Sequence, residues 1–389
     1  MTSSKPLVPI QGEKPASNNF DLIRICMALL VVVSHSYALY RGSELGEPLS
    51  RLTQSTINSG NLGVYVFFMV SGYLITQSFN HSKSYWSYLK KRIARIHPGF
   101  IVATSLCGFV IVPIFSQTAH FTPWLVMKAL VLNLLLQGFF VDNSTFSHNL
   151  VTAVNGSLWS IPYEFWCYLG VLALGIVGLM KSKRRVVIAV LCFAVMATGF
   201  WLEVTGRKPG GGVIGTIIGW PYLWFKVLPC FLAGMLVHQY REILPRRLWL
   251  LITAAALVLI AANLPLPQPW KTAVVGFLFP PCAAYAVFYL AFMRQIADGA
   301  RFGDFSYGTY LYAFPVQQIL LACFGQRIPF LLFILISMVL SLGAGIVSWF
   351  TVERWFLSRQ RRTRHSEVNT AKIKAQTEEH GDKHPCVQA

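Results

Sequence analysis

The sequence contains few charged residues for its length. Only 12% of the 389 residues are charged, 54% are hydrophobic, and the mean hydropathy is +0.53. This deficit of charge excludes an ordinary soluble globular protein. The composition instead predicts an all-α, polytopic membrane protein whose single helical domain takes up nearly the whole chain.

The sequence also contains no Cys-x-x-Cys pair, although it has eight cysteines. Seven of them lie inside apolar segments, and Cys386 lies in the polar C-terminal tail. We therefore expect no disulfide framework and no structural zinc site. His365, His380 and His384 share the tail with Cys386 but lack the spacing of metal ligands. No metal site is expected there.

Acidic residues are scarce as well, and the net charge is +18. Such an excess of positive charge could indicate a nucleic-acid partner, but this would require one continuous basic face. Here the basic residues form short clusters between apolar runs, as in the cytoplasmic loops of membrane proteins. We expect contacts with membrane lipids and no nucleic-acid partner.

Ten apolar stretches are long enough to cross a bilayer, which needs about 20 residues. They are 20–40, 60–80, 99–117, 157–180, 186–203, 213–237, 248–264, 272–293, 305–324 and 328–353. An eleventh stretch, 124–140, is short, contains Lys128 and follows a proline. We predict that it forms an interfacial or re-entrant helix on the outer side.

With this assignment the loops rich in lysine and arginine all fall on one side, so the positive-inside rule places both termini in the cytoplasm. The first apolar run is too long for a signal peptide and lacks a small-residue cleavage site. We expect a polar cytoplasmic lead at 1–19, a membrane domain at 20–355 and a basic, disordered cytoplasmic tail at 356–389.

Two polar residues interrupt the first expected span, Phe20 to Tyr40. Arg24 and His35 are eleven residues apart, which places them on nearly the same helix face with about 16 Å of axial rise between them. A charged side chain in hydrocarbon is costly and normally faces the protein interior or a wet cavity. Together on one face they favour a functional role. Arg24 snorkelling to lipid head groups and His35 as a packing residue remain the alternatives.

Three further residues suit a catalytic or binding site. Glu164 lies about 10 Å inside the fourth expected span, which predicts a depth similar to that of His35. A histidine beside a carboxylate could serve as a base for acyl transfer to a hydroxyl. Arg92 and Arg95 would share one face if their segment is helical, and paired guanidiniums suit phosphate oxygens. The alternatives are a Glu164 hydrogen bond that only ties helices together and arginines that only set the topology.

The chain resembles the acyltransferase-3 family of integral-membrane enzymes, which O-acylate bacterial surface glycans and related acceptors. The resemblance runs from about Asn19 to Trp355 and depends on motifs in the family's order. They are Arg24 with His35 eleven residues later, VFFMVSGYLI, RIAR, SLWSIPYEF and SYGTYLYAFPVQ. The chain departs from the family where many members have Val-Glu-Glu, since Tyr163 here leaves Glu164 as a single carboxylate. It also has only a short polar stretch after the last span, where some members carry a fused hydrolase-like domain.

The resemblance implies that His35 is catalytic with Arg24 as its companion, that Arg92 and Arg95 hold the acyl-CoA donor in the cytoplasm, and that Glu164 belongs to a functional motif. The resemblance therefore implies an O-acetyltransferase of the bacterial inner membrane, which moves an acetyl group from cytoplasmic acetyl-CoA to a hydroxyl of a surface glycan or lipid-linked saccharide. Direct transfer and a covalent acyl-histidine relay are both open. The alternative function is a proton-coupled transporter or flippase for a glycan or small solute.

Overall fold

The described part of the protein is built from helices. The computed structural model describes residues 7, 18–142, 144–180, 184–296 and 303–358, and within these ranges the chain forms no strand. The prediction of an all-α fold is therefore confirmed. Most of the expected lead (1–19) and nearly all of the expected tail (356–389) lie outside the described residues.

Among the described residues, seven helices are long and apolar enough to cross a membrane. They are α1 (Phe20–Arg41), α3 (Ser59–Asn80), α4 with its continuation through α5 (Tyr85–Phe115), α8 (Arg185–Val204), α10 (Pro221–Tyr240), α12 (Gln268–Ala291) and α14 with its continuation (Phe330–Ser358). The chain is a multi-pass membrane protein.

Three other expected spans also coincide with helices, namely α7 (Ser160–Ile176), α11 (Leu248–Ala262) and α13 (Ser306–Phe324). The first two are short, and α13 carries several polar side chains. The count of ten spans and the side of each terminus stay predictions. Short helices connect the longer ones: α2 (Pro48–Leu52), α6 (Pro123–Leu134) and α9 (Gly212–Ile218).

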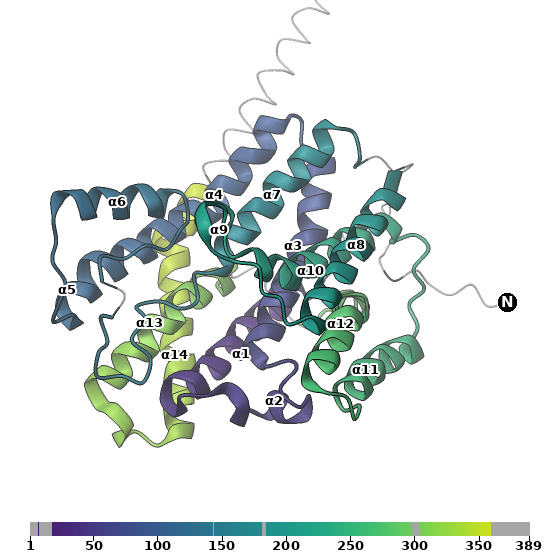
Figure 1. Ribbon diagram of the computed structural model, residues 1–389. Coiled ribbons are helices and arrows are strands. Elements are labelled where there is room, and N and C mark those ends of the chain that lie inside the picture. The colour runs from purple at the N-terminus through teal and green to yellow at the C-terminus, as the bar shows by residue number, and fades with distance from the viewer. Residues whose placement is uncertain (1–6, 8–17, 143, 181–183, 297–302, 359–389) are drawn as a thin grey trace, which may run out of the picture.

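Helix α6 occupies the eleventh apolar stretch and lies at the edge of the bundle (Figure 1). Its 12 residues extend about 18 Å, which is too short to cross a bilayer. Trp124, Met127 and Leu134 are exposed along it. This short apolar helix agrees with the prediction of a segment that does not span.

Helix α4 begins much earlier than the sequence predicted. The hydroxyl of Ser84 caps its first turn by accepting a hydrogen bond from the amide of Ser87 (3.1 Å), and the helix then continues through Pro98. The basic segment expected to be a loop is thus helical. Arg92 and Arg95 therefore share one face of α4 and are held on a rigid element.

The centre of the bundle depends on close contacts between helix backbones. A Cβ atom added to Gly72 of α3 would lie 2.0 Å from the carbonyl oxygen of Phe231 in α10. A Cβ added to Gly234 of α10 would meet the carbonyl oxygen of Met69 at the same distance. Small residues that allow such an approach are typical of helix contacts in membranes. They hold α3 firmly against α10.

Helix α1 packs against α3 on one side and against α13 on the other. A Cβ added to Gly63 of α3 would lie 2.8 Å from the carbonyl oxygen of Met27. From α13, the side chain of Gln317 donates hydrogen bonds to the carbonyl of Val32 (2.9 Å) and to the hydroxyl of Ser36 (2.7 Å). These contacts hold the helix that carries Arg24 and His35 between α3 and α13.

Replacement of Gly72 by Ala should lower the stability of the bundle by about 1–3 kcal/mol, because the added methyl group must displace a backbone carbonyl. The unfolding temperature of the purified protein in detergent measures this loss. Gly276→Ala in α12 is the control, since a Cβ there meets nothing within 4 Å. Equal unfolding temperatures for the two variants would contradict the close packing of α3 and α10.

Candidate functional site

A large cavity opens between α1, α3, α4, α7 and α13. Its volume is about 830 Å³, within the range of roughly 300–1,000 Å³ that is typical of ligand sites. Its wall contains the basic residues Arg24, Lys83, Lys90, Lys91, Arg92 and Arg95 together with Glu164. We call it the basic cavity. A wall with this balance of charge suits an anionic ligand.

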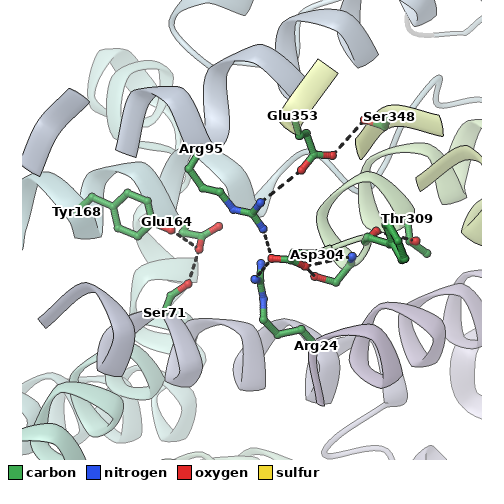
Figure 2. A network of polar contacts seen from close by, with 11 residues as sticks. Arg24, Ser71, Arg95, Glu164, Tyr168, Asp304, Thr309, Ser348 and Glu353 are labelled. Atoms are coloured by element: carbon green, nitrogen blue, oxygen red, sulfur yellow. Dashed lines mark hydrogen bonds and ion pairs between the residues drawn. The ribbon is translucent and has the colours of Figure 1, made fainter. Parts of the chain in front are cut away.

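Two arginines in this wall share one carboxylate, as Figure 2 shows. Arg24 of α1 and Arg95 of α4 both form ion pairs with Oδ2 of Asp304, just before α13. The other oxygen of Asp304 accepts hydrogen bonds from the amide (3.3 Å) and the hydroxyl (2.5 Å) of Ser306. A single side chain therefore joins three helices that are far apart in the sequence.

The two arginines also determine the charge state of Asp304. Burial alone would raise the pKa of its carboxyl, but the guanidiniums of Arg24 and Arg95 outweigh burial and hold the pKa well below its usual range. The Asp304 carboxyl is therefore ionised at every pH above the usual pKa of an aspartate. Because its pKa is depressed, the stability that it contributes is present above the usual pKa and is lost only at lower pH.

A second carboxylate, that of Glu353, forms an ion pair with Arg95. Glu353 ends a π-helical turn (Trp349–Glu353) and lies 3.4 Å from Nη1 of Arg95. The hydroxyl of Ser348 donates to its other oxygen (3.1 Å). Turns of this type are often found at functional sites because they displace a side chain from the regular helix positions.

Arg92 has a different environment from the other two arginines. Within the described residues it forms no ion pair, and its buried Nε atom has no hydrogen-bond partner. The guanidinium carbon lies 5.9 Å from the ring centre of Tyr88 and 5.8 Å from that of Tyr168. One terminal nitrogen donates to the hydroxyl of Ser78 (3.3 Å). Arg92 thus keeps its positive charge uncompensated by a bound carboxylate in this part of the wall.

Glu164 lies in the second turn of α7 and also lines the basic cavity. One of its oxygens accepts hydrogen bonds from the hydroxyls of Ser71 in α3 and Tyr168 in α7, the latter at 2.6 Å. Figure 2 shows Glu164 on the side of the network nearest to Tyr168. Four of the five predicted site residues, Arg24, Arg92, Arg95 and Glu164, are therefore brought together around one cavity.

His35 lies apart from this group. Its ring packs edge-on against Phe314 of α13, with 5.2 Å between ring centres, and its buried Nδ1 atom has no partner among the described residues. Tyr307, seven residues earlier in α13, lines the basic cavity with Glu164. Seven residues correspond to about 10 Å along a helix. The expectation that His35 and Glu164 lie at the same depth was wrong, and their catalytic roles stay predictions.

Sequence reasoning missed Asp304 and Glu353. Asp304 comes just before one apolar stretch and Glu353 ends another, in a chain with only 15 acidic residues. That scarcity was a usable signal, because arginines in a membrane need anionic partners. No group of His, Cys, Asp and Glu side chains in the described ranges is arranged as a set of metal ligands.

Replacement of Tyr168 by Phe should lower the free energy of unfolding by about 1.5–3 kcal/mol, because it removes a hydrogen bond to the Glu164 carboxylate. Thermal unfolding in detergent measures the change. Tyr85→Phe removes an exposed phenol hydroxyl from α4 and is the control. If both variants unfold at the temperature of the wild type, the hydrogen bond does not hold Glu164 in place.

Comparison with known proteins identifies the family. The family described as "acyltransferase domain" matches residues 17–350. An O-acetyl transferase of Shigella phage Sf6 is 28% identical over 88% of this chain and 97% of its own length. Nodulation protein 10 of Rhizobium leguminosarum bv. viciae is 27% identical over 78% of this chain and 84% of its own.

A third relative, the acyltransferase MdmB of Streptomyces mycarofaciens, is 26% identical over 38% of this chain and 36% of its own. No solved structure matches the chain. The family match covers the helices that build the basic cavity as well as the helix that carries His35. The protein therefore belongs to the acyltransferase-3 family and is a membrane acyltransferase.

Proposed function

We propose that the protein is an O-acetyltransferase of the bacterial inner membrane that uses acetyl-CoA as donor and a hydroxyl of a surface glycan or lipid-linked saccharide as acceptor. The basic cavity carries this proposal. It joins an arginine-rich wall to the helix on which His35 lies, in a chain whose relatives include an O-acetyl transferase.

The chemistry of the cavity suits the donor. Coenzyme A carries phosphate groups, and guanidiniums bind phosphate oxygens through charge-assisted hydrogen bonds. Arg24, Arg92 and Arg95 place three guanidiniums in the wall, and the volume of about 830 Å³ suits a ligand of that size. The loop charges support a cytoplasmic opening for this cavity.

The position of His35 suits the transfer step. It lies eleven residues beyond Arg24 on α1, about 16 Å further along the helix axis. In the proposed reaction the imidazole takes the proton from the acceptor hydroxyl, whose oxygen attacks the thioester carbonyl. The new C–O bond forms as the C–S bond breaks, and the imidazolium gives its proton to the thiolate, so that coenzyme A leaves as a thiol. Glu164 then acts near the bound acetyl-CoA, since it lines the same cavity as the three arginines.

His35→Ala should abolish acetylation of the surface glycan, because the acceptor hydroxyl loses its base. Loss of general-base catalysis costs about 10²–10⁴-fold in rate. The acetyl content of surface polysaccharide, measured by NMR in cells that produce each variant, reports the effect. His120→Ala, at an exposed histidine, is the control. Normal acetylation by a His35→Ala protein inserted at the normal level would contradict the proposed mechanism.

An acetyltransferase consumes acetyl-CoA, whereas a transporter or flippase does not. Purified protein with acetyl-CoA and unacetylated glycan should release free coenzyme A in proportion to the acetyl groups transferred. A transporter or flippase would move a solute without breaking a thioester. Solute movement without release of coenzyme A would therefore contradict the proposal and support the transporter.

A further inference from the structure

The three arginines of the basic cavity fall into two groups. Arg24 and Arg95 share Asp304, and Arg95 also contacts Glu353. Arg92 forms no ion pair among the described residues and has a buried Nε atom without a partner. The family motif Arg-x-x-Arg therefore contains one arginine that is paired with carboxylates, Arg95, and one that is not, Arg92.

This difference changes which arginine can attract an anion. Asp304 forms ion pairs with both guanidiniums, and Glu353 lies 3.4 Å from Nη1 of Arg95, so acidic groups offset part of the positive charge of Arg24 and Arg95. Glu164 interacts electrostatically with Arg92, but the two side chains form no ion pair, and one oxygen of Glu164 accepts two hydroxyl hydrogen bonds. Arg92 is also positioned between Tyr88 and Tyr168, which holds its guanidinium in a defined place.

The ion pairs of Asp304 also restrict the movement of α1, the helix that carries His35. Arg24 and His35 belong to the same helix, so a contact that fixes Arg24 limits both the rotation and the sliding of α1. Asp304 ties Arg24 to Arg95 of α4 and lies directly before α13, the helix on which His35 packs through Phe314. The Asp304 carboxylate thus links the helices that line the basic cavity to the helix that packs against His35.

We infer that Asp304 is a positioning residue that occupies Arg24 and Arg95, while Arg92 is the arginine that binds the phosphates of the donor. This inference depends on the proposed use of acetyl-CoA and assigns separate roles to the arginines. Arg92 contributes affinity for the phosphates. Asp304, through Arg24, keeps His35 aligned with the cavity and contributes to the rate of transfer.

Binding of coenzyme A to the purified protein in detergent, measured by isothermal titration calorimetry, tests the role of Arg92. Arg92→Gln should weaken binding about tenfold or more, because a hydrogen bond between charged groups is lost. Binding of pantetheine, which lacks phosphate, should not change. Equal affinity of wild type and Arg92→Gln for coenzyme A would overturn the inference.

Asp304→Asn tests the positioning role with a different readout. This variant should bind coenzyme A at least as tightly as the wild type, because two guanidiniums lose their carboxylate. Its turnover, measured as radiolabelled acetyl transfer to membranes that contain unacetylated glycan, should fall about tenfold or more. Asp304→Glu keeps the charge and should recover most of the turnover. Weaker binding of coenzyme A with unchanged turnover would overturn the positioning role.

The matched control is Glu203→Gln, which removes another carboxylate that is paired with a cation, Lys226, away from the basic cavity. It should leave both affinity and turnover near the wild-type values. An equal loss of turnover in Glu203→Gln and Asp304→Asn would show general damage to the helix bundle and would overturn the inference. If the wild type itself does not bind coenzyme A, the proposed function fails, and this result is distinct from a failure of the inference.

Discussion

The ion pairs between the Asp304 carboxylate and two guanidiniums are the interaction on which the arrangement of this site depends. Arg24 and Arg95 lie in helices that are apolar enough to cross a membrane, where an unpaired charge is costly. Breaking a buried pair by removing one partner leaves the other charge uncompensated, which costs about 3–5 kcal/mol. Asp304 therefore stabilises two arginines in the wall of the basic cavity.

The helix contacts around this network explain why it is rigid. Glycines bring α3 against both α1 and α10 with backbone atoms in contact, so these helices cannot shift without a clash. Gln317 fixes the C-terminal half of α1 to α13 through the Val32 carbonyl and the Ser36 hydroxyl. Arg24 fixes the other end of the same helix. His35 lies between these two attachments and is thereby held at a defined distance from the basic cavity.

The sequence allowed much of this structure to be predicted, because hydropathy and helical spacing are local properties. Each of the ten expected spans overlaps a helix, although the sixth, 213–237, is divided between α9 and α10. The spacing of Arg92 and Arg95 correctly indicated one shared face. The pairing of Arg24 with Asp304 could not be predicted in this way, since 280 residues separate the partners. Such a contact depends on how α13 packs against α1, which no local pattern reports.

The errors have equally specific causes. The early start of α4 was missed because its basic residues resemble a cytoplasmic loop, whereas Ser84 in fact caps a helix there. The predicted depth of Glu164 was wrong because it was counted from the expected end of the fourth span. Helix α7 begins at Ser160, and its position is determined by packing against α3 and α13. Depth in a bundle is thus a property of neighbouring helices as well as of the helix itself.

The central claim is that the donor binds in the basic cavity with its thioester directed toward His35. A cryo-EM structure of the protein with coenzyme A tests it most directly. The account predicts density for the phosphates beside Arg92, with the chain of the donor extending along α1 toward His35. Coenzyme A bound elsewhere on the protein, or bound in the cavity with its thiol directed away from His35, would contradict the account.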